Sequence, residues 1–145
     1  MASSYTKGEL VEMALGELGI AHYAFDIEAE EDVRALRRLD GMMDGFQAAL
    51  DPIGYEQPAT AGESSPSDLA GIDGALVEAV ITNLALRIAP SYGKMPQAET
   101  KRAAREGKSL LFSRYAKPIE LEMPTRTPRG AGSHRAWRRN YFLAS

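Results

Sequence analysis

Apolar residues cover nearly the whole circumference of one predicted helix, and we expect the other elements to pack around it. This stretch runs from Val77 to Gly93, where Val77, Leu84 and Ile88 follow the three-to-four spacing of one helical face. A second apolar stripe lies on the neighbouring face, and burying each methylene group stabilises the fold by about 0.8 kcal/mol. Pro90 lacks a backbone N–H and disfavours a helical conformation at the residue before it. We therefore predict a buried central helix that ends before Pro90 and turns by Gly93.

A first amphipathic helix is predicted near the N-terminus. Thr6 and Glu9 have the spacing of a capping box, in which each side chain satisfies the other residue's free backbone N–H. Gly19 is placed to end this helix in a left-handed conformation. The predicted core face consists of Leu10, Ala14, Leu15 and Leu18.

A second helix is predicted to open with the acidic run from Asp26 to Asp32 and to end near Leu50. Its expected core face consists of Val33, Leu36, Leu39, Met43, Phe46 and Leu50. Gly41 and Gly45 lie in its interior, where each glycine costs about 1 kcal/mol relative to alanine. They indicate a close approach of another backbone or a bend.

Residues 51–74 are punctuated by proline, glycine and serine and are interpreted as a long connection. A connection of this length in a compact domain is usually functional or disordered, and we expect it to order only against a neighbouring subunit. A fourth helix is predicted to start near Pro96, which would take the favoured first helical position, and to run to about Tyr115. Because its large apolar residues are Leu110, Leu111 and Phe112, we expect only its second half to contact the core. The pattern predicts an all-α fold, a small bundle of about four helices.

The charge of the chain is divided between a body and a tail. Residues 117–145 carry six basic and two acidic residues, a net charge of +4, so residues 1–116 carry −7 in a chain of net charge −3. The tail also contains Trp137, Tyr141 and Phe142 among arginines, a composition typical of interface hot spots. Such segments commonly become ordered on a partner, although a solvated terminus is the alternative. We therefore divide the chain into a helical domain, 1–116, and an extended C-terminal tail, 117–145.

Composition and spacing exclude several kinds of chemical site. The absence of cysteine excludes disulfides, thiolate nucleophiles and sulfur-ligated zinc. His22 and His134 lie far apart without acidic residues at metal-ligand spacing, so no metal site is expected. No secretory signal or membrane-spanning segment is recognised, and we expect a soluble protein made in the cytoplasm.

Several polar residues leave alternatives open. Asp40 and Asp44 are interpreted as ordinary surface charges, with Arg37 positioned to pair with Asp40. Asn83 and Arg87 lie one turn apart on the central helix. They belong either to an internal hydrogen-bond network or to a buried contact across a subunit boundary.

A set of segments, taken in order, resembles one known family. They are TKGELV and ALGELGI between residues 6 and 20, the helix around Leu39–Phe46, NLALRIAPSY at 83–92, GKSLL at 107–111, and a glycine-rich stretch leading to Trp137 and Tyr141. Together they resemble the head-to-tail adaptors of short-tailed bacteriophages, also called tail accessory factors or packaged-DNA stabilisation proteins. The resemblance spans nearly the whole chain, and residues 83–92 are its strongest part.

The resemblance implies a head-to-tail connector in the virion, with twelve copies forming a ring below the portal ring. The C-terminal extension would bind the portal, while the ring would extend the DNA channel, retain packaged DNA and attach later tail proteins of the nozzle or needle type. An acidic body suits a channel wall, because like charge keeps DNA from adhering as it passes. No cofactor, membrane contact or sequence-specific DNA binding is expected. The expected portal-binding residues are Arg135, Trp137, Arg138, Arg139, Tyr141 and Phe142, with Trp137 as the central anchor.

Two functions are considered as alternatives to that of a head-to-tail connector. A peptidoglycan hydrolase needs two carboxylates about 5 to 10 Å apart, one of them desolvated enough to stay protonated. Glu28, Glu30 and Glu31 are the first candidates, although acidic residues in a first helical turn are favoured by the helix dipole alone. A DNA-binding regulator would use the basic helix Gln97–Lys108, but the acidic body argues against it. We assign no catalytic residue.

Overall fold

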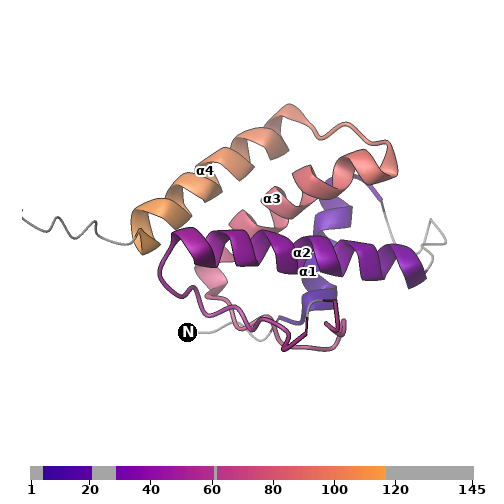
Figure 1. Ribbon diagram of the computed structural model, residues 1–145. Helices are drawn as coiled ribbons and strands as arrows, with labels where there is room; N and C mark the ends of the chain where they lie inside the picture. The colour runs from indigo at the N-terminus through magenta and orange to yellow at the C-terminus, as the bar shows by residue number, and fades with distance from the viewer. Residues whose placement is uncertain (1–4, 21–28, 61, 117–145) are drawn as a thin grey trace, which may run out of the picture.

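The structure is an all-α bundle with one long loop. The computed structural model describes residues 5–20, 29–60 and 62–116, and within these ranges the chain forms helices and no strand. The elements are α1 (Lys7–Glu17), α2 (Ala29–Ala49), the 3-10 helix η1 (Gly74–Leu76), α3 (Val77–Ile88), the 3-10 helix η2 (Ala89–Tyr92) and α4 (Ala98–Tyr115). In Figure 1, α2 crosses the front of the molecule, α4 runs above it and the long loop runs below it. The predicted four-helix fold is confirmed.

Helix α3 is the centre of the bundle, as its apolar pattern predicts. It packs against α1, α2 and α4. Its buried residues are Val77, Ala79, Val80, Ile81, Thr82, Leu84, Ala85 and Ile88. The prediction that Pro90 forces the preceding residue out of the helical region is wrong, since Ala89 has φ −46° and ψ −46°. Pro90 fits because it lies at the start of η2, where a backbone N–H is not needed, and η2 ends at Gly93 with φ 62°.

Helix α1 is capped at both ends as the sequence predicts. The Thr6 side chain accepts from the Glu9 N–H, and the Glu9 carboxylate accepts from the Thr6 N–H at 2.8 Å. Gly19 follows the helix with φ 69°. The first N–H groups of the helix, at Lys7 and Gly8, donate to carbonyl oxygens of the loop at 2.8 and 2.9 Å. The loop therefore satisfies donors that a helix start would otherwise leave unpaired.

The core face of α2 is largely as predicted. Leu36, Leu39, Met43, Phe46 and Leu50 are buried, but Val33 is 41% exposed, so its assignment to the core is wrong. The first residues of the acidic run, from Asp26 to Glu28, lie outside the described residues.

The interior glycines of α2 do not mark a close approach. A Cβ atom added at Gly41 or Gly45 would meet nothing within 4 Å, so that interpretation is wrong. The close approach occurs instead at Gly107 of α4, where an added Cβ would lie 2.7 Å from the Ala79 Cβ and 2.8 Å from its Cα. A glycine at 107 thus lets α4 pack directly against the backbone of α3.

Two expectations for α4 are also wrong. The helix begins at Ala98 with Gln97 as its N-cap, so Pro96 precedes the helix. The first half of α4 is anchored to the core as well, because Thr100 is 6% and Ala104 1% exposed. Small residues suffice there because the two helix backbones are close, and they gave no apolar signal in the sequence.

The loop at residues 51–73 is held by its own chain. Ile53, Tyr55, Ala70 and Ile72 are all buried in the core. The Asp51 N–H donates to the Tyr115 carbonyl oxygen at 2.8 Å, beside an antiparallel bridge between Leu50 and Ala116. The expectation that this loop orders only against a neighbouring subunit is therefore wrong.

Candidate functional site

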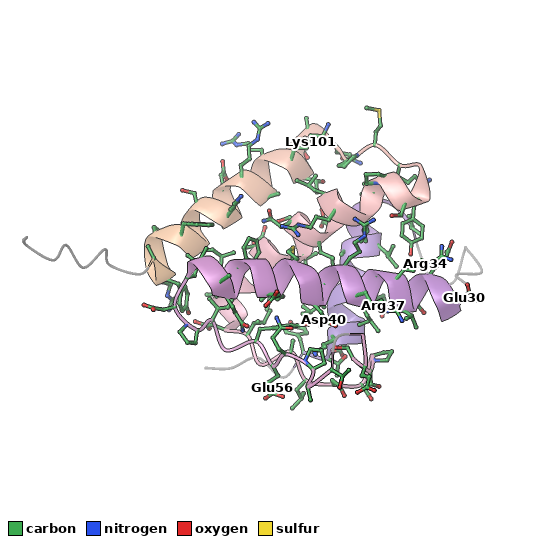
Figure 2. All side chains as sticks on the ribbon, in the orientation of Figure 1. Glu30, Arg34, Arg37, Asp40, Glu56 and Lys101 are labelled. Carbon is green, nitrogen blue, oxygen red and sulfur yellow. The ribbon has the colours of Figure 1, made fainter. Side chains whose placement is uncertain are left out.

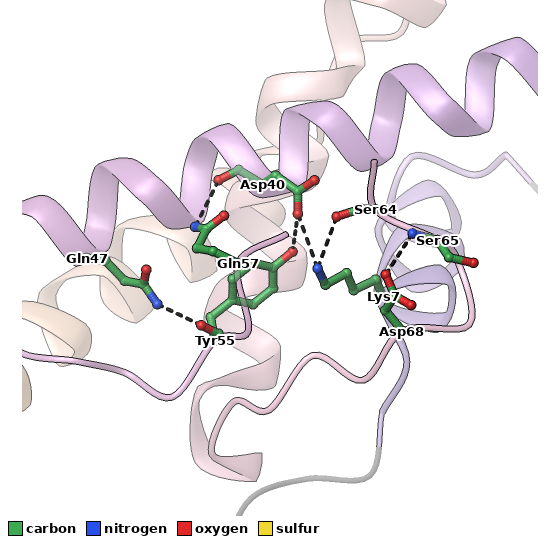
Figure 3. Close-up of polar contacts among 8 residues, drawn as sticks. All are labelled: Lys7, Asp40, Gln47, Tyr55, Gln57, Ser64, Ser65 and Asp68. Carbon is green, nitrogen blue, oxygen red and sulfur yellow. Dashed lines mark hydrogen bonds and ion pairs between the residues drawn. The ribbon is translucent and has the colours of Figure 1, made fainter. Parts of the chain in front are cut away.

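A buried lysine joins the loop to α1 and α2 (Figure 3). Lys7 is 1% exposed, and its ammonium group donates to Ser64 Oγ at 3.0 Å. The same nitrogen lies 3.6 Å from Asp40 Oδ1 and 4.9 Å from the centre of the Tyr55 ring. A buried ammonium group is tolerated only when it is paired, and here a carboxylate, a hydroxyl and an aromatic face surround it.

The Asp40 carboxylate, which contacts Lys7, also accepts a hydrogen bond from a second group. The Tyr55 hydroxyl donates to Asp40 Oδ1 at 2.6 Å, a short charge-assisted hydrogen bond. Burial raises the pKa of the Tyr55 hydroxyl above its ordinary value, and Asp40 raises it further because ionised tyrosine would face the carboxylate. Gln47 of α2 also donates to the Tyr55 carbonyl oxygen at 2.9 Å. We call Lys7, Asp40, Tyr55 and Ser64 the loop-anchoring cluster.

The cluster corrects the interpretation of Asp40 as a surface charge. Asp40 is 8% exposed and bonds to Lys7 and Tyr55 rather than to Arg37, whereas Asp44 is exposed as predicted. Lys7, Tyr55 and Ser64 bond within the cluster, where Asp40 accepts through Oδ1, whereas Asp40 Oδ2 is buried with no hydrogen-bond partner among the described residues. Its role is to hold the loop in place.

The acidic first turn of α2 lies beside a cleft. The Glu30 side chain is 80% exposed and lies 3.5 Å from Arg34, so it lacks the desolvation that a general acid needs. Glu31 borders a cleft of about 400 Å³ between α2 and η2, together with Arg34, Arg37, Arg38, Ser91 and Tyr92. Burial raises the pKa of the Tyr92 hydroxyl, and the nearby Glu31 and Asp32 raise it further. Glu28 lies outside the described residues.

One residue of the polar pair on α3, Asn83, has its hydrogen-bond partners within the chain. Asn83 donates to the Ala79 carbonyl oxygen at 2.7 Å and to the Ala104 carbonyl oxygen at 3.0 Å, so its amide joins α3 to α4. Arg87 is exposed, with its guanidinium carbon 6.0 Å from the centre of the Phe46 ring. The internal-network interpretation is thus confirmed for Asn83.

The predicted portal-binding residues lie outside the part of the chain that the structure describes. This applies to Arg135, Trp137, Arg138, Arg139, Tyr141 and Phe142, and also to His22 and His134. Among the described residues, no group of three histidine or acidic side chains has a geometry that holds a metal ion. None of the described helices combines the length and apolarity needed to cross a bilayer.

A helical body that holds its own loop, followed by a basic and aromatic segment, is typical of a protein that works by contacts with other chains. The family model of the P22 tail accessory factor matches residues 1–144. The chain belongs to the P22 tail accessory factor family, which makes it a structural tail component of a phage particle. The resemblance found in the sequence is therefore confirmed, and the match includes the tail.

One curated relative carries a different name. The chain is similar to the peptidoglycan hydrolase gp27 of Acyrthosiphon pisum secondary endosymbiont phage 1, at 27% identity over 106 residues. The matched region covers 72% of this chain and 66% of that protein, so the chain spans just under two thirds of the relative's length.

Proposed function

We propose that the protein is a head-to-tail connector that binds the portal ring through residues 117–145. The observation that carries the proposal is the family match over residues 1–144, which includes both the helical body and the basic, aromatic tail. In this proposal twelve copies form a ring that extends the DNA channel, retains the packaged genome and offers attachment sites to later tail proteins. The protein would act in the virion at the head-to-tail junction.

The proposal gives the helical body and the C-terminal tail different roles, because the body packs against itself. The long loop and all four helices bury their apolar residues against each other, so the body completes its core within one chain. In this proposal Trp137, Tyr141 and Phe142 contact the portal, with Arg135, Arg138 and Arg139 as charged contacts. A central aromatic anchor surrounded by arginine is the composition that dominates binding energy at interfaces.

The first experiment is co-sedimentation of the protein with isolated portal rings. We expect the Trp137→Ala variant to bind the portal with a dissociation constant raised at least about thirtyfold, since an interface hot spot contributes about 2 kcal/mol or more. Arg126→Ala is the matched control within the tail, and we expect less than about a fivefold change because it lies outside the aromatic cluster. A chain ending at Ala116 should retain its helical circular dichroism and lose binding. Normal portal binding by Trp137→Ala would refute the assignment of the tail as the portal anchor.

A second function, peptidoglycan cleavage, is favoured by the likeness to the peptidoglycan hydrolase gp27. The contacts of Glu30 weigh against it, because this carboxylate is solvated and paired with Arg34. Glu31, which borders the cleft, is the remaining described candidate from the sequence. Release of soluble fragments from purified peptidoglycan, abolished by Glu31→Gln, would establish this activity, and no release by the wild-type protein would exclude it.

A further inference from the structure

Charge is segregated along the sequence of the body. No lysine or arginine occurs between Arg38 and Arg87, a stretch that holds eight acidic residues. From Arg87 to Ala116 there are seven basic residues and two acidic ones. The fold places part of these two segments on opposite sides of the molecule. Figure 2 shows this with Lys101 of α4 at the top and Glu56 of the loop at the bottom.

The basic side of α4 has a regular surface. Lys101, Arg105, Lys108 and Phe112 are spaced by four, three and four residues, so they line one side of the helix. All four are exposed, and the Lys108 ammonium lies 5.8 Å from the centre of the Phe112 ring. No acidic residue in the described ranges forms an ion pair with the three cations. We call these four residues the basic stripe.

The opposite side presents acidic groups on a fixed backbone. Glu56 and Glu63 are exposed on the loop that the loop-anchoring cluster holds to the body. Leu69 lies on the same loop and is 52% exposed. We call these three exposed residues of the loop, Glu56, Glu63 and Leu69, the acidic loop face. Each of the two faces thus combines charges of one sign with an exposed apolar side chain.

We infer that the basic stripe of one copy docks on the acidic loop face of the next copy. The occupant is a second copy because the chain itself supplies both complementary surfaces, and because stripe-to-stripe or loop-to-loop contacts would place like charges together. Contacts between two different faces are heterologous, and they generate a ring when the rotation between copies closes. The inference names the contact between copies in the proposed ring and rests on the proposed function in that respect.

The contact between the basic stripe and the acidic loop face is expected to be weak, because it is exposed to water and salt. Its charges are exposed, so each pair contributes little and is screened by salt. The free protein is therefore largely monomeric at physiological salt. Copies held side by side on a portal ring have a high effective concentration, which makes a weak contact sufficient there.

The test uses charge reversal on the full-length chain. Lys101→Glu/Arg105→Glu reverses the stripe, and Glu56→Lys/Glu63→Lys reverses the loop face. In sedimentation velocity at about 20 mM salt, we expect wild-type protein to self-associate and each variant alone to associate at least about tenfold more weakly. An equimolar mixture of the two variants should recover association to within about threefold of wild type, because every contact in an alternating array is again between opposite charges.

The control reverses two exposed charges outside both faces. Arg34→Glu/Arg38→Glu on α2 matches the charge change of the stripe variant, and we expect it to associate as wild type. The inference is overturned if the wild-type protein does not associate, if association stops at a dimer, or if the mixture is no stronger than its components. Portal binding by the tail is measured separately, so loss of portal binding with intact self-association would reject the proposed function and leave this contact standing.

Discussion

Replacing Lys7 by methionine tests whether the loop-anchoring cluster stabilises the fold through its buried charge. Lys7→Met keeps the length of the side chain and removes the ammonium group, which leaves the Asp40 carboxylate with the Tyr55 hydroxyl as its remaining partner. The side chains of the ion pair are 2% and 11% exposed. Breaking such a pair from one side costs about 3–5 kcal/mol, because the remaining charge is uncompensated. We expect a loss of about 3 kcal/mol, a large fraction of the roughly 5–15 kcal/mol that stabilises a domain.

The chain offers a control at nearly the same distance. Arg34 and Glu30 lie 3.5 Å apart, against 3.6 Å for Lys7 and Asp40, but their side chains are 72% and 80% exposed. Arg34→Met should therefore cost less than about 0.5 kcal/mol in the same experiment. The measurement is urea unfolding followed by far-UV circular dichroism, with the free energy obtained by linear extrapolation.

A double variant separates the loss of stability caused by an unpaired charge from the loss caused by altered packing. Asp40→Asn keeps an acceptor for the Tyr55 hydroxyl and removes the negative charge. We expect Lys7→Met/Asp40→Asn to lose at least about 2 kcal/mol less than the sum of the two single losses, since the second change removes the unpaired charge left by the first. Equal losses for Lys7→Met and Arg34→Met, or additive losses in the double variant, would refute the argument.

Two further predictions concern packing and pH. Gly107→Ala should destabilise the protein by about 1–3 kcal/mol, because the new Cβ would lie 2.7 Å from the Ala79 Cβ. Gly41→Ala, at a helical position with nothing within 4 Å, should stabilise it by up to about 1 kcal/mol, and urea unfolding that ranks the two the other way contradicts the packing. The raised pKa of Tyr55 means that its neutral form is kept in the folded state while the unfolded chain ionises near pH 10.0. The contribution of Tyr55 to stability is therefore unchanged below that pH and falls above it by about 1.4 kcal/mol per pH unit. Tyr55→Phe should make the alkaline fall in stability shallower by this amount, while the share of Tyr92 stays.

The helices were predictable because each has a local signature. The capping box at Thr6 and Glu9 fixes the start of α1, and the dense apolar pattern of 77–88 identifies the central helix. These signals depend on residues a few positions apart, so they can be recognised without knowledge of the rest of the fold.

The buried charges were missed although the sequence held a signal for them. Lys7 shares a helical face with Leu10 and Ala14, and Asp40 shares one with Leu36 and Met43, so periodicity alone places both charges in the core. Their partners Tyr55 and Ser64 lie in the loop, and only the fold shows that the loop returns to this point. The close approach at Gly107 was missed for the same reason, since its neighbour Ala79 belongs to another helix. The portal-binding assignment of the tail stays a prediction.

The point where the body meets the tail has a mechanical consequence. Tyr115 and Ala116 at the end of α4 are joined to Leu50 and Asp51 by backbone contacts. Tension on the chain beyond Ala116 is thus transmitted to the end of α2 as well as along α4. Unwinding of α4 under load must first break this attachment, so a pull directed along the tail acts on two elements of the body together.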